Sequence, residues 1–340
     1  MDIFSKYKKE IELAYLIRKT EESLLSLFSM GKLFGTVHTC IGQEFSAVAV
    51  GRNLSDNDNV FSNHRCHGHF LAYKRNVKGL ISEIMGKKDG VCGGLGGSQH
   101  LYQDNFYSNG IQGGILPVSA GLAMVQKLEK NNGITIVFIG DGTLGEGVVY
   151  ETMNIASKWE LPLLIVCENN SYAQSTSIDQ TLAGDITDRA KSFGIKSCTS
   201  NTWKWDDLFL DMEQSFDFIR NSSKPVFHLV NTYRLKAHSK GDDDRSKQEI
   251  TDYESKDSLN IILNSNKDNP VFKDMLKHID EEIQNAILMS MDSPFSILEN
   301  MAEEDTPTNW QDLAFDKERC VTSIQRAFND ILSENKKTVF

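Results

Sequence analysis

The chain has 340 residues, 40% of them hydrophobic and 24% charged, which is enough for one large or two medium globular domains with a sizeable core. Its formal net charge of −11 argues against nonspecific binding to nucleic acid or to an anionic membrane. An anionic ligand would need local positive charge, from arginines, helix N-termini or a metal ion.

Neither export nor membrane insertion is indicated. Residues 1–22 are charged and amphipathic, without the apolar centre of a signal peptide. No stretch approaches the roughly 18 apolar residues that a membrane-spanning helix needs. The six cysteines are scattered and form no CxxC pair, which is typical of reduced thiols. We therefore predict a cytoplasmic protein that contacts neither membrane nor nucleic acid.

The hydrophobic pattern predicts helices and apolar strands in alternation. Helices are expected at about residues 1–30, 43–52, 77–88, 115–130, 145–160, 185–194 and 205–223, and the helix at 115–130 should be buried. Strands are expected at residues 59–63, 134–140, 161–169 and 224–234. Loops are expected in the His/Arg-rich stretch after the first strand, in the glycine-rich residues 89–102, and in the polar residues 235–249.

Fully apolar strands that alternate with helices are typical of a parallel sheet covered on both faces. We predict an α/β fold with a doubly wound parallel sheet and helices on both faces. Residues 1–250 should form this domain, including an N-terminal helix, and residues 251–340 a helical C-terminal extension. Ligands of such sheets bind beyond the carboxyl ends of the strands.

Two polar islands stand at such strand ends. "GDG" (140–142) follows one apolar strand, and "ENN" (168–170) follows the next. Glycines beside Asp141 leave the backbone bare, so that a bulky anion can approach, and the helix expected to begin near Gly145 would point its N-terminus there. Because Asp141 would repel a phosphate, a divalent cation between them is indicated.

Asn170 fits such a site as a neutral oxygen ligand, and the backbone carbonyl of Tyr172 offers another. Carboxylate, amide and carbonyl oxygens together with phosphate oxygens suit Mg²⁺. Taken alone, GDG is a common tight turn and NN is a weaker signal. Their separation by one right-handed crossover makes a shared metal–diphosphate site the better interpretation.

This pairing resembles the diphosphate motif of thiamine diphosphate enzymes, and further motifs narrow the family. The motifs are "FSNHRCHGHFLA", "GGLGGSQHLY", "NGIQGGILPVSAGLA", "ETMNIASKWELP", "ENNSYA" and "TYRLKAHSKGDDD". In this order they resemble the alpha subunit of the first, decarboxylating component of 2-oxo acid dehydrogenase complexes, over about residues 10–290. The pyruvate and acetoin dehydrogenase members are the most similar, although "TLGEG" and "YAQSTS" depart from the pyruvate pattern and leave the substrate open.

The resemblance implies thiamine diphosphate and Mg²⁺ as cofactors, and it assigns roles to particular residues. His38 and His238 are the candidates for proton transfer in catalysis. The candidates for metal binding are Asp141, Asn170 and Tyr172. The candidates for cofactor binding are His64, Arg65, Gly110, Gln112, Asp141, Gly142, Thr143, Asn170, Arg234 and His238. Gln112 is expected to act through its main chain, and the 89–102 loop to lie on the cofactor side. A zinc site in "HRCHGH" is disfavoured, because no cysteine pair accompanies it.

The resemblance also implies partners. In that family a second thiamine-binding domain supplies a glutamate to the cofactor, and this chain has no second run of buried strands for it. We expect a separate beta subunit in an alpha2-beta2 heterotetramer, and a lipoyl-bearing acyltransferase that receives the acyl group after oxidative decarboxylation. Two alternatives stay open: the N-terminal half of a split transketolase-like enzyme, favoured by "GDGTLGEG", and a non-catalytic scaffold of this fold.

Overall fold

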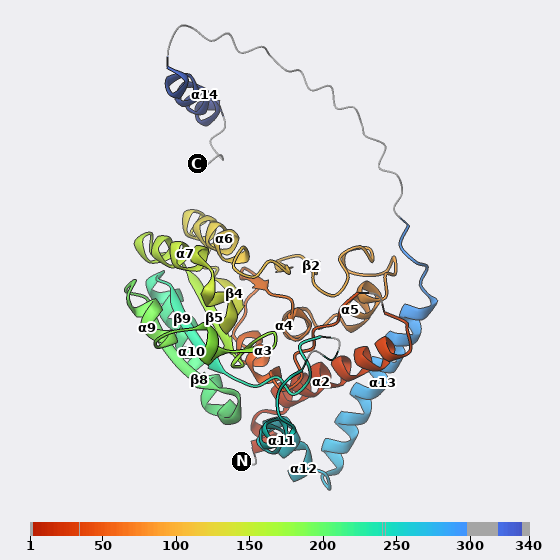
Figure 1. The fold of residues 1–340 in the computed structure, drawn as a ribbon. Coiled ribbons are helices and arrows are strands. Elements are labelled where there is room, and N and C mark those ends of the chain that lie inside the picture. Colours follow the sequence, from red (N-terminus) through yellow and green to blue (C-terminus); the bar gives the residue numbers. More distant parts are fainter. Residues whose placement is uncertain (1–2, 34, 240, 242, 298–318, 335–340) are drawn as a thin grey trace. The chain divides into compact units, whose positions relative to one another are not determined.

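The computed structural model describes residues 3–33, 35–239, 241, 243–297 and 319–334 (Figure 1). The chain forms two compact units, residues 1–297 and residues 298–340. The described part of the second unit is one helix, α14 (Cys320–Glu334). The first unit extends beyond residue 250, because the long helix α13 (Pro270–Asp292) packs against helices from the start of the chain.

A sheet forms the centre of the first unit, as predicted, but it has seven strands where four were expected. The strand order is β2-β3-β1-β4-β5-β9-β8, and every neighbouring pair is parallel except β2 with β3. The strands are β1 (Asn59–Ser62), β2 (Tyr102–Gln103), β3 (Phe106–Ser108), β4 (Thr135–Gly140), β5 (Leu163–Asn169), β8 (Lys196–Asn201) and β9 (Val226–Asn231).

Helices cover both faces of this sheet, because successive strand residues point to opposite sides. In β4, Ile136 and Phe138 face one core, while Val137 and Ile139 face the other. The second core is covered by α6 (Ile115–Glu129), α7 (Gly147–Lys158) and α9 (Ile186–Lys191). The first is covered by α2 (Lys8–Ser29), α3 (Glu44–Gly51), α4 (Cys66–Lys74) and α10 (Trp205–Ser222). The predicted doubly wound α/β fold is therefore confirmed.

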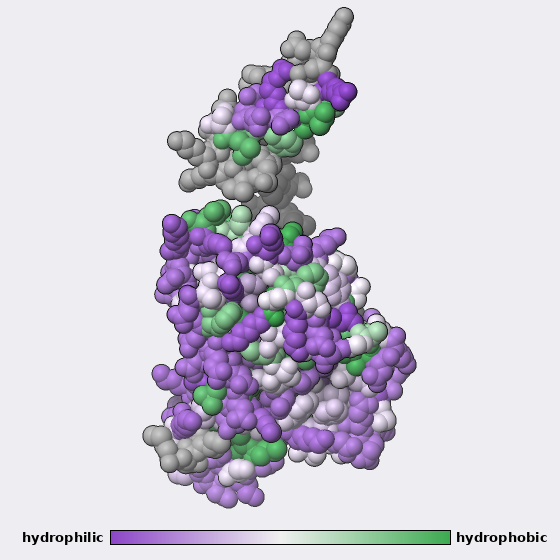
Figure 2. Space-filling view, turned by 90° about the vertical axis from the view of Figure 1, so that its left-hand side faces the viewer, coloured by the Kyte–Doolittle hydropathy of each residue, from purple (hydrophilic) through white to green (hydrophobic). Residues whose placement is uncertain are grey.

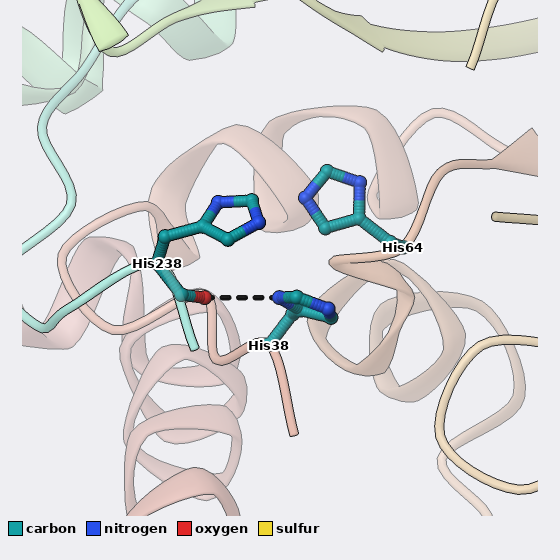
Figure 3. A group of neighbouring side chains, drawn as sticks. All are labelled: His38, His64 and His238. Atoms are coloured by element: carbon teal, nitrogen blue, oxygen red, sulfur yellow. Dashed lines mark hydrogen bonds between the residues drawn. The ribbon is translucent and has the colours of Figure 1, made fainter. Parts of the chain in front are cut away.

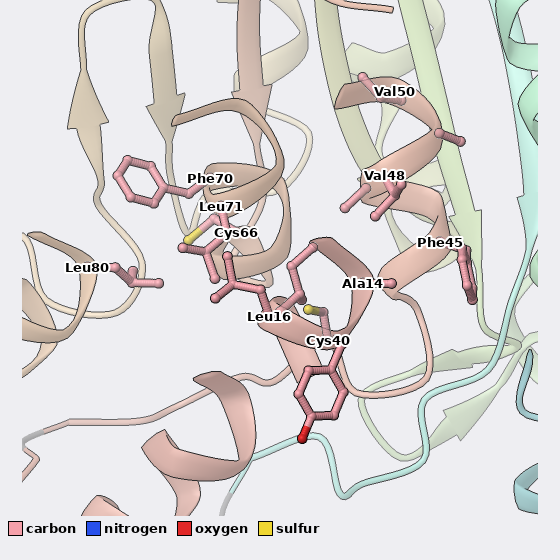
Figure 4. Packing of buried hydrophobic residues seen from close by; sticks show 14 of the residues in the cluster. Ala14, Leu16, Cys40, Phe45, Val48, Val50, Cys66, Phe70, Leu71 and Leu80 are labelled. Atoms are coloured by element: carbon pink, nitrogen blue, oxygen red, sulfur yellow. The ribbon is translucent and has the colours of Figure 1, made fainter. Parts of the chain in front are cut away.

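In the larger core, residues of α2, α3, α4 and α5 (Val77–Ile84) pack together (Figure 4). A buried ion network crosses it: Arg18 on α2 binds Glu44 on α3 and Asp257, with 3.0 Å between Arg18 Nη2 and Asp257 Oδ1. Asp257 caps α12 (Ser258–Ser265) through the amide of Asn260. The segment after residue 250 is thus joined to the N-terminal helix by charge-assisted hydrogen bonds.

The short elements are α1 (Ile3–Lys6), η1 (Asp141–Gly145), β6 (Tyr172–Ala173), β7 (Thr176–Ser177), α8 (Ile178–Thr181), η2 (Thr202–Lys204) and α11 (Lys247–Ser255).

Two of the elements that differ from the prediction contain many polar residues. The segment after β1, expected to be a loop, is helix α4, whose His67 and His69 are buried and bonded to Glu21 and Glu168. Strand β8 was not predicted, since its sequence "KSCTSN" lacks an apolar run. As the edge strand of the sheet it pairs on one side alone, which lets polar residues occupy it.

Helix α6 is only half buried, so the expectation of a fully buried helix was wrong. Val118, Val125 and Leu128 are exposed on its outer face.

In the view of Figure 2, hydrophilic residues cover most of the surface and hydrophobic ones form small separate patches. Among the described residues no helix has both the length and the apolarity required to cross a bilayer.

The glycine-rich loop is organised by one buried carboxylate. Oε2 of Glu83 accepts the backbone N–H groups of Cys92 and Gly94 at 2.7 and 2.8 Å. Oε1 accepts those of Gly96 and Gly97 at 2.6 and 3.1 Å. These N–H groups are therefore committed to the protein and not to a ligand. The side chain of Leu95, between them, is exposed.

A buried histidine joins β8, β9 and α10. His228 on β9 lies with Nε2 3.1 Å from Ser200 Oγ and Nδ1 2.9 Å from Ser215 Oγ. Burial lowers the pKa of His228 to about 4, and the nearby carboxylate of Asp211 offsets part of that effect. The ring is therefore neutral in the native state near pH 5, where a histidine of the unfolded chain is protonated.

We expect this histidine to make stability pH-dependent. Between the ordinary histidine pKa of about 6.5 and about 4, the unfolded state binds a proton that the native state does not. The contribution is complete above pH 6.5 and is lost as the pH falls, by on the order of 3 kcal/mol. Urea unfolding between pH 4 and 7 measures it. His228→Gln should show a shallower decline than the unsubstituted protein, and equal slopes would contradict the assignment.

Candidate functional site

The predicted site residues gather in one cavity at the carboxyl ends of the strands. Its volume is about 430 Å³. The cavity is lined by turns that follow β1, β3, β4, β5 and β9. The predicted residues that line it are His38, His64, Arg65, Gly110, Gln112, Asp141, Gly142, Thr143, Asn170, Tyr172 and His238. Arg234 lies behind the wall, where it donates to the carbonyl oxygen of Gln174 at 2.9 Å.

Asp141 and Asn170 lie side by side, as the crossover predicted. The amide N–H of Asn170 points at Asp141 Oδ1 over 3.4 Å, and both side chains are buried. Oδ1 of Asn170 accepts the N–H of Tyr172 at 3.2 Å. Burial raises the pKa of Asp141 to about 6, although Arg234 and Arg65 oppose this shift. A buried carboxylate with so long a hydrogen bond is suited to a cation.

The two glycines beside Asp141 have different neighbours. A Cβ at Gly142 would lie 2.7 Å from Cβ of Ala173, so Gly142 is needed for the close approach of β6. A Cβ at Gly140 would meet no atom within 4 Å.

The helix that was expected to begin near Gly145 begins at Gly147, because residues 141–145 form the 3₁₀ turn η1. The turn η1, and not the first turn of α7, therefore follows β4 directly.

Positive charge is concentrated behind the cavity. Arg65 is buried; its Nη1 donates to the carbonyl oxygen of Thr39 at 2.7 Å and its Nη2 to Nδ1 of His238 at 3.0 Å. Burial and the charge of Arg234 lower the pKa of Arg65 to about 10. Two buried guanidinium groups that repel each other destabilise the folded state unless a bound anion compensates their charge. The cavity is therefore suited to an anionic ligand.

Three histidines from distant parts of the chain converge at this cavity (Figure 3). The rings of His38 and His64, and those of His38 and His238, have centroids 4.7 Å apart. Nδ1 of His38 lies 2.9 Å from the carbonyl oxygen of His238, to which it can only donate. Figure 3 shows His64 and His238 pointing ring nitrogens toward each other.

The hydrogen-bond partners assign the protons of these rings. Arg65 can only donate, so Nδ1 of His238 accepts and its Nε2 carries the proton. The side-chain amide of Gln112 donates to Nδ1 of His64 at 2.7 Å. We expected Gln112 to act through its main chain and did not foresee this side-chain contact. Burial and the charge of Arg65 lower the pKa of His64 to about 2, so this ring is neutral.

Metal coordination by all three rings is disfavoured, even though their ligand atoms lie within 4.8 Å of one another. Each neutral ring has one nitrogen lone pair for a metal, and those of His238 and His64 already accept hydrogen bonds from Arg65 and Gln112. His67 and His69 take no part, because they are buried against Glu21 and Glu168.

Several lining residues were not predicted as site residues. Glu168 belongs to the same "ENN" motif as Asn170, and Gln43 stands directly before α3. Burial raises the pKa of Glu168, but His69 and Arg65 hold it below its usual range. The sequence signal for both was their position: Glu168 lies near the end of a predicted strand, and Gln43 lies at the start of a predicted helix. The others are Asn63, Gln99, Gly140, Glu146, Ala173 and Gln174.

The cavity fits a diphosphate with a divalent cation. Nε2 of His64 and Nε2 of Gln43 are buried N–H donors without a protein acceptor among the described residues. They face the same cavity as the Arg65 guanidinium, which suits phosphate oxygens. Asp141 and Asn170 provide the hard oxygen ligands that Mg²⁺ prefers.

The comparison with protein families agrees with this chemistry. Residues 12–296 match the model of the family described as dehydrogenase E1 component. The chain belongs to this family. The match covers the whole cavity and ends close to the end of α13.

Curated relatives extend over the same region. A pyruvate dehydrogenase E1 component subunit alpha of Rickettsia felis is 33% identical over 299 residues, which are 85% of this chain and 92% of the relative. The alpha subunit of the acetoin:2,6-dichlorophenolindophenol oxidoreductase of Bacillus subtilis is 33% identical over 300 residues, 85% of this chain and 89% of that protein. The corresponding pyruvate dehydrogenase subunit of Rhizobium meliloti is 32% identical over 285 residues, 82% of each chain.

The two glycines of the GDG turn provide a matched test of the packing. Gly142→Ala should lower the free energy of unfolding by about 1–3 kcal/mol, because the new methyl group displaces Ala173. Gly140→Ala adds the same methyl group to open space and should cost well under that amount. Chemical unfolding without ligand compares the two variants. Equal losses would show that β6 does not pack on Gly142 as described.

Proposed function

We propose that this chain is the alpha subunit of a thiamine diphosphate- and Mg²⁺-dependent 2-oxo acid dehydrogenase. The observation that carries the proposal is the pairing of Asp141 and Asn170 with the buried Arg65 in one cavity of a dehydrogenase E1 chain. The names of the relatives support pyruvate or a similar 2-oxo acid, or acetoin, as the substrate. The same names favour this reaction over the transketolase-like one.

Each group of lining residues has a binding task in this proposal. Asp141, Oδ1 of Asn170 and the carbonyl oxygen of Tyr172 hold Mg²⁺. The guanidinium of Arg65 and the N–H of His64 Nε2 bind the diphosphate, while Arg234 adds positive charge from behind. Gly142 and Thr143 in η1, together with Gly110 and Gln112 between β3 and α6, line the cavity wall against the cofactor.

The histidines move protons. Bound thiamine diphosphate supplies the nucleophile and the electron sink for loss of carbon dioxide. His38 donates from Nδ1 to a backbone carbonyl, so its Nε2 is the acceptor that takes a proton from a reacting group. The opposite tautomer at His238 makes its Nε2 a donor. A proton acceptor, Nε2 of His38, and a hydrogen-bond donor, Nε2 of His238, thus stand in the same cavity.

Partners complete the enzyme in this proposal. A separate beta subunit, in an alpha2-beta2 assembly, provides the second half of the cofactor site, and a lipoyl-bearing acyltransferase accepts the acyl group. The names of the relatives, which are alpha subunits, support the first of these partners. We place the enzyme in the cytoplasm, where the six cysteines, all free thiols, would stay reduced.

The metal site is tested by substitution. Asp141→Ala and Asn170→Ala should each abolish Mg²⁺-dependent binding of thiamine diphosphate, because each removes an oxygen ligand at the cavity wall. Asn231→Ala, which alters a partly buried asparagine at the end of the neighbouring strand β9, is the control and should bind normally. Calorimetry on the co-purified alpha and beta chains measures the affinity. Normal affinity in either ligand variant would remove that residue from the metal site.

The activity itself needs an assay of the assembled enzyme. We expect the purified chain alone to be inactive, and the co-expressed alpha and beta chains to decarboxylate a 2-oxo acid in the presence of an artificial electron acceptor. A screen over 2-oxo acids, with acetoin included, identifies the substrate. An assembled pair that binds the cofactor but turns over none of them would favour the scaffold alternative.

A further inference from the structure

One carboxylate outside the cavity joins two of the segments that form it. Glu249 lies on α11 and is partly buried. It accepts the hydroxyl of Tyr172 at 2.9 Å on Oε1 and at 3.1 Å on Oε2. It also accepts the hydroxyl of Tyr233 at 2.8 Å on Oε1. Bonds to an ionised acceptor are about twice as strong as bonds between neutral groups.

The first of these bonds leads to the metal site. Tyr172 stands in β6, and its N–H donates to Oδ1 of Asn170 at 3.2 Å. The N–H of Asn170 in turn points at Asp141 over 3.4 Å. A continuous chain of contacts therefore runs from Glu249 through Tyr172 and Asn170 to Asp141. The carbonyl of Tyr172 and the amide of Asn170 are both oriented by this chain.

The second bond leads to the segment that carries His238. Tyr233 follows β9 and stacks on Tyr253 of α11, with ring centroids 3.7 Å apart. Arg245 donates to the carbonyl oxygens of Arg234 and Lys236, and its guanidinium lies 4.9 Å from the Tyr233 ring centre. The backbone between residues 233 and 236 is thereby held against α11.

The pKa values agree with a common environment for the two tyrosines. Burial raises the pKa of Tyr172, and the Glu249 carboxylate raises it further. Burial and Glu249 act in the same way on Tyr233, while Arg245 opposes them.

We propose that Glu249 is a positioning residue, which touches neither metal nor cofactor but holds the Tyr172 turn and the Tyr233 segment in the relative position that forms the cavity. This inference rests on the proposed function, since it assigns the two segments to metal binding and to proton transfer. Without Glu249 the turn after β5 loses its anchor on α11. The oxygen ligands of Asn170 and Tyr172 then spend less time in the geometry that Mg²⁺ requires.

The first test needs no ligand. Hydrogen exchange is measured on the full-length chain with its beta subunit, in Glu249→Ala, Glu249→Gln and the control Gln248→Ala. Gln248 is exposed on the same helix, and its side-chain amide donates to Oδ1 of Asp252 at 2.7 Å. We expect faster exchange in residues 170–174 and 231–236 for Glu249→Ala, a smaller effect for Glu249→Gln, which still accepts a hydrogen bond, and none for Gln248→Ala.

The second test measures Mg²⁺ affinity by calorimetry at saturating thiamine diphosphate. We expect Glu249→Ala to weaken it at least tenfold, Glu249→Gln to restore most of it, and Tyr172→Phe to reproduce the loss. Tyr233→Phe, which removes the other bond, should leave Mg²⁺ affinity within about twofold. If Glu249→Ala does not fold, Tyr172→Phe and Glu249→Gln decide the question.

The outcomes separate this inference from the proposed function. If the unsubstituted enzyme fails to bind thiamine diphosphate and Mg²⁺, the proposed function is wrong, and the exchange experiment alone decides whether Glu249 holds the two segments. If the unsubstituted enzyme binds both, unchanged exchange or unchanged Mg²⁺ affinity in Glu249→Ala overturns the positioning role. Equal losses in Tyr172→Phe and Tyr233→Phe would also overturn it, because they indicate a general loss of packing.

Discussion

The parallel register of β4 and β5 is the constraint from which the site follows. Gly140 pairs with Glu168 at the end of the two strands, so the next residues of each strand leave the sheet at the same point. Asp141 and Asn170 must therefore be neighbours, whatever the length of α7 between them. The strands β1 and β9, parallel to these two, bring Arg65 and the His238 segment to the same edge. Four distant parts of the chain thus meet without a long excursion of any loop.

Buried carboxylates away from the cavity and the two buried arginines beside it have separate tasks. Glu21, Glu44 and Glu83 are each saturated by donors of the protein itself, and each fixes a helix or loop in place. Arg65 and Arg234 contact carbonyl oxygens and a histidine in the contacts described above, and they keep their positive charge at the cavity. A chain with a formal charge of −11 can in this way present an electropositive site.

Much of the architecture could be predicted because it depends on local patterns. The apolar strands β4, β5 and β9 are buried on both faces, and the GDG and ENN turns follow from where those strands end. The polar edge strand β8 and helix α4 could not be predicted in this way, since their polar residues find partners only in the folded protein. The same holds for the tautomers of the histidines in the cavity. The tautomer of His238 depends on Arg65, and that of His64 depends on Gln112. In each pair the two residues lie far apart in the sequence.

The way in which Glu83 holds the glycine-rich loop has a consequence for how the family can diverge. Glu83 recognises backbone N–H groups, so it excludes proline at the donor positions but places no demand on the side chain of Leu95. The flanking Gly94 and Gly96, in contrast, have no room for a Cβ. The exposed Leu95 can therefore be exchanged in evolution while Gln99, a few residues further, keeps its place in the cavity wall. The outer surface of this loop can therefore change at residue 95 without a change in the backbone that places Gln99 in the cavity wall.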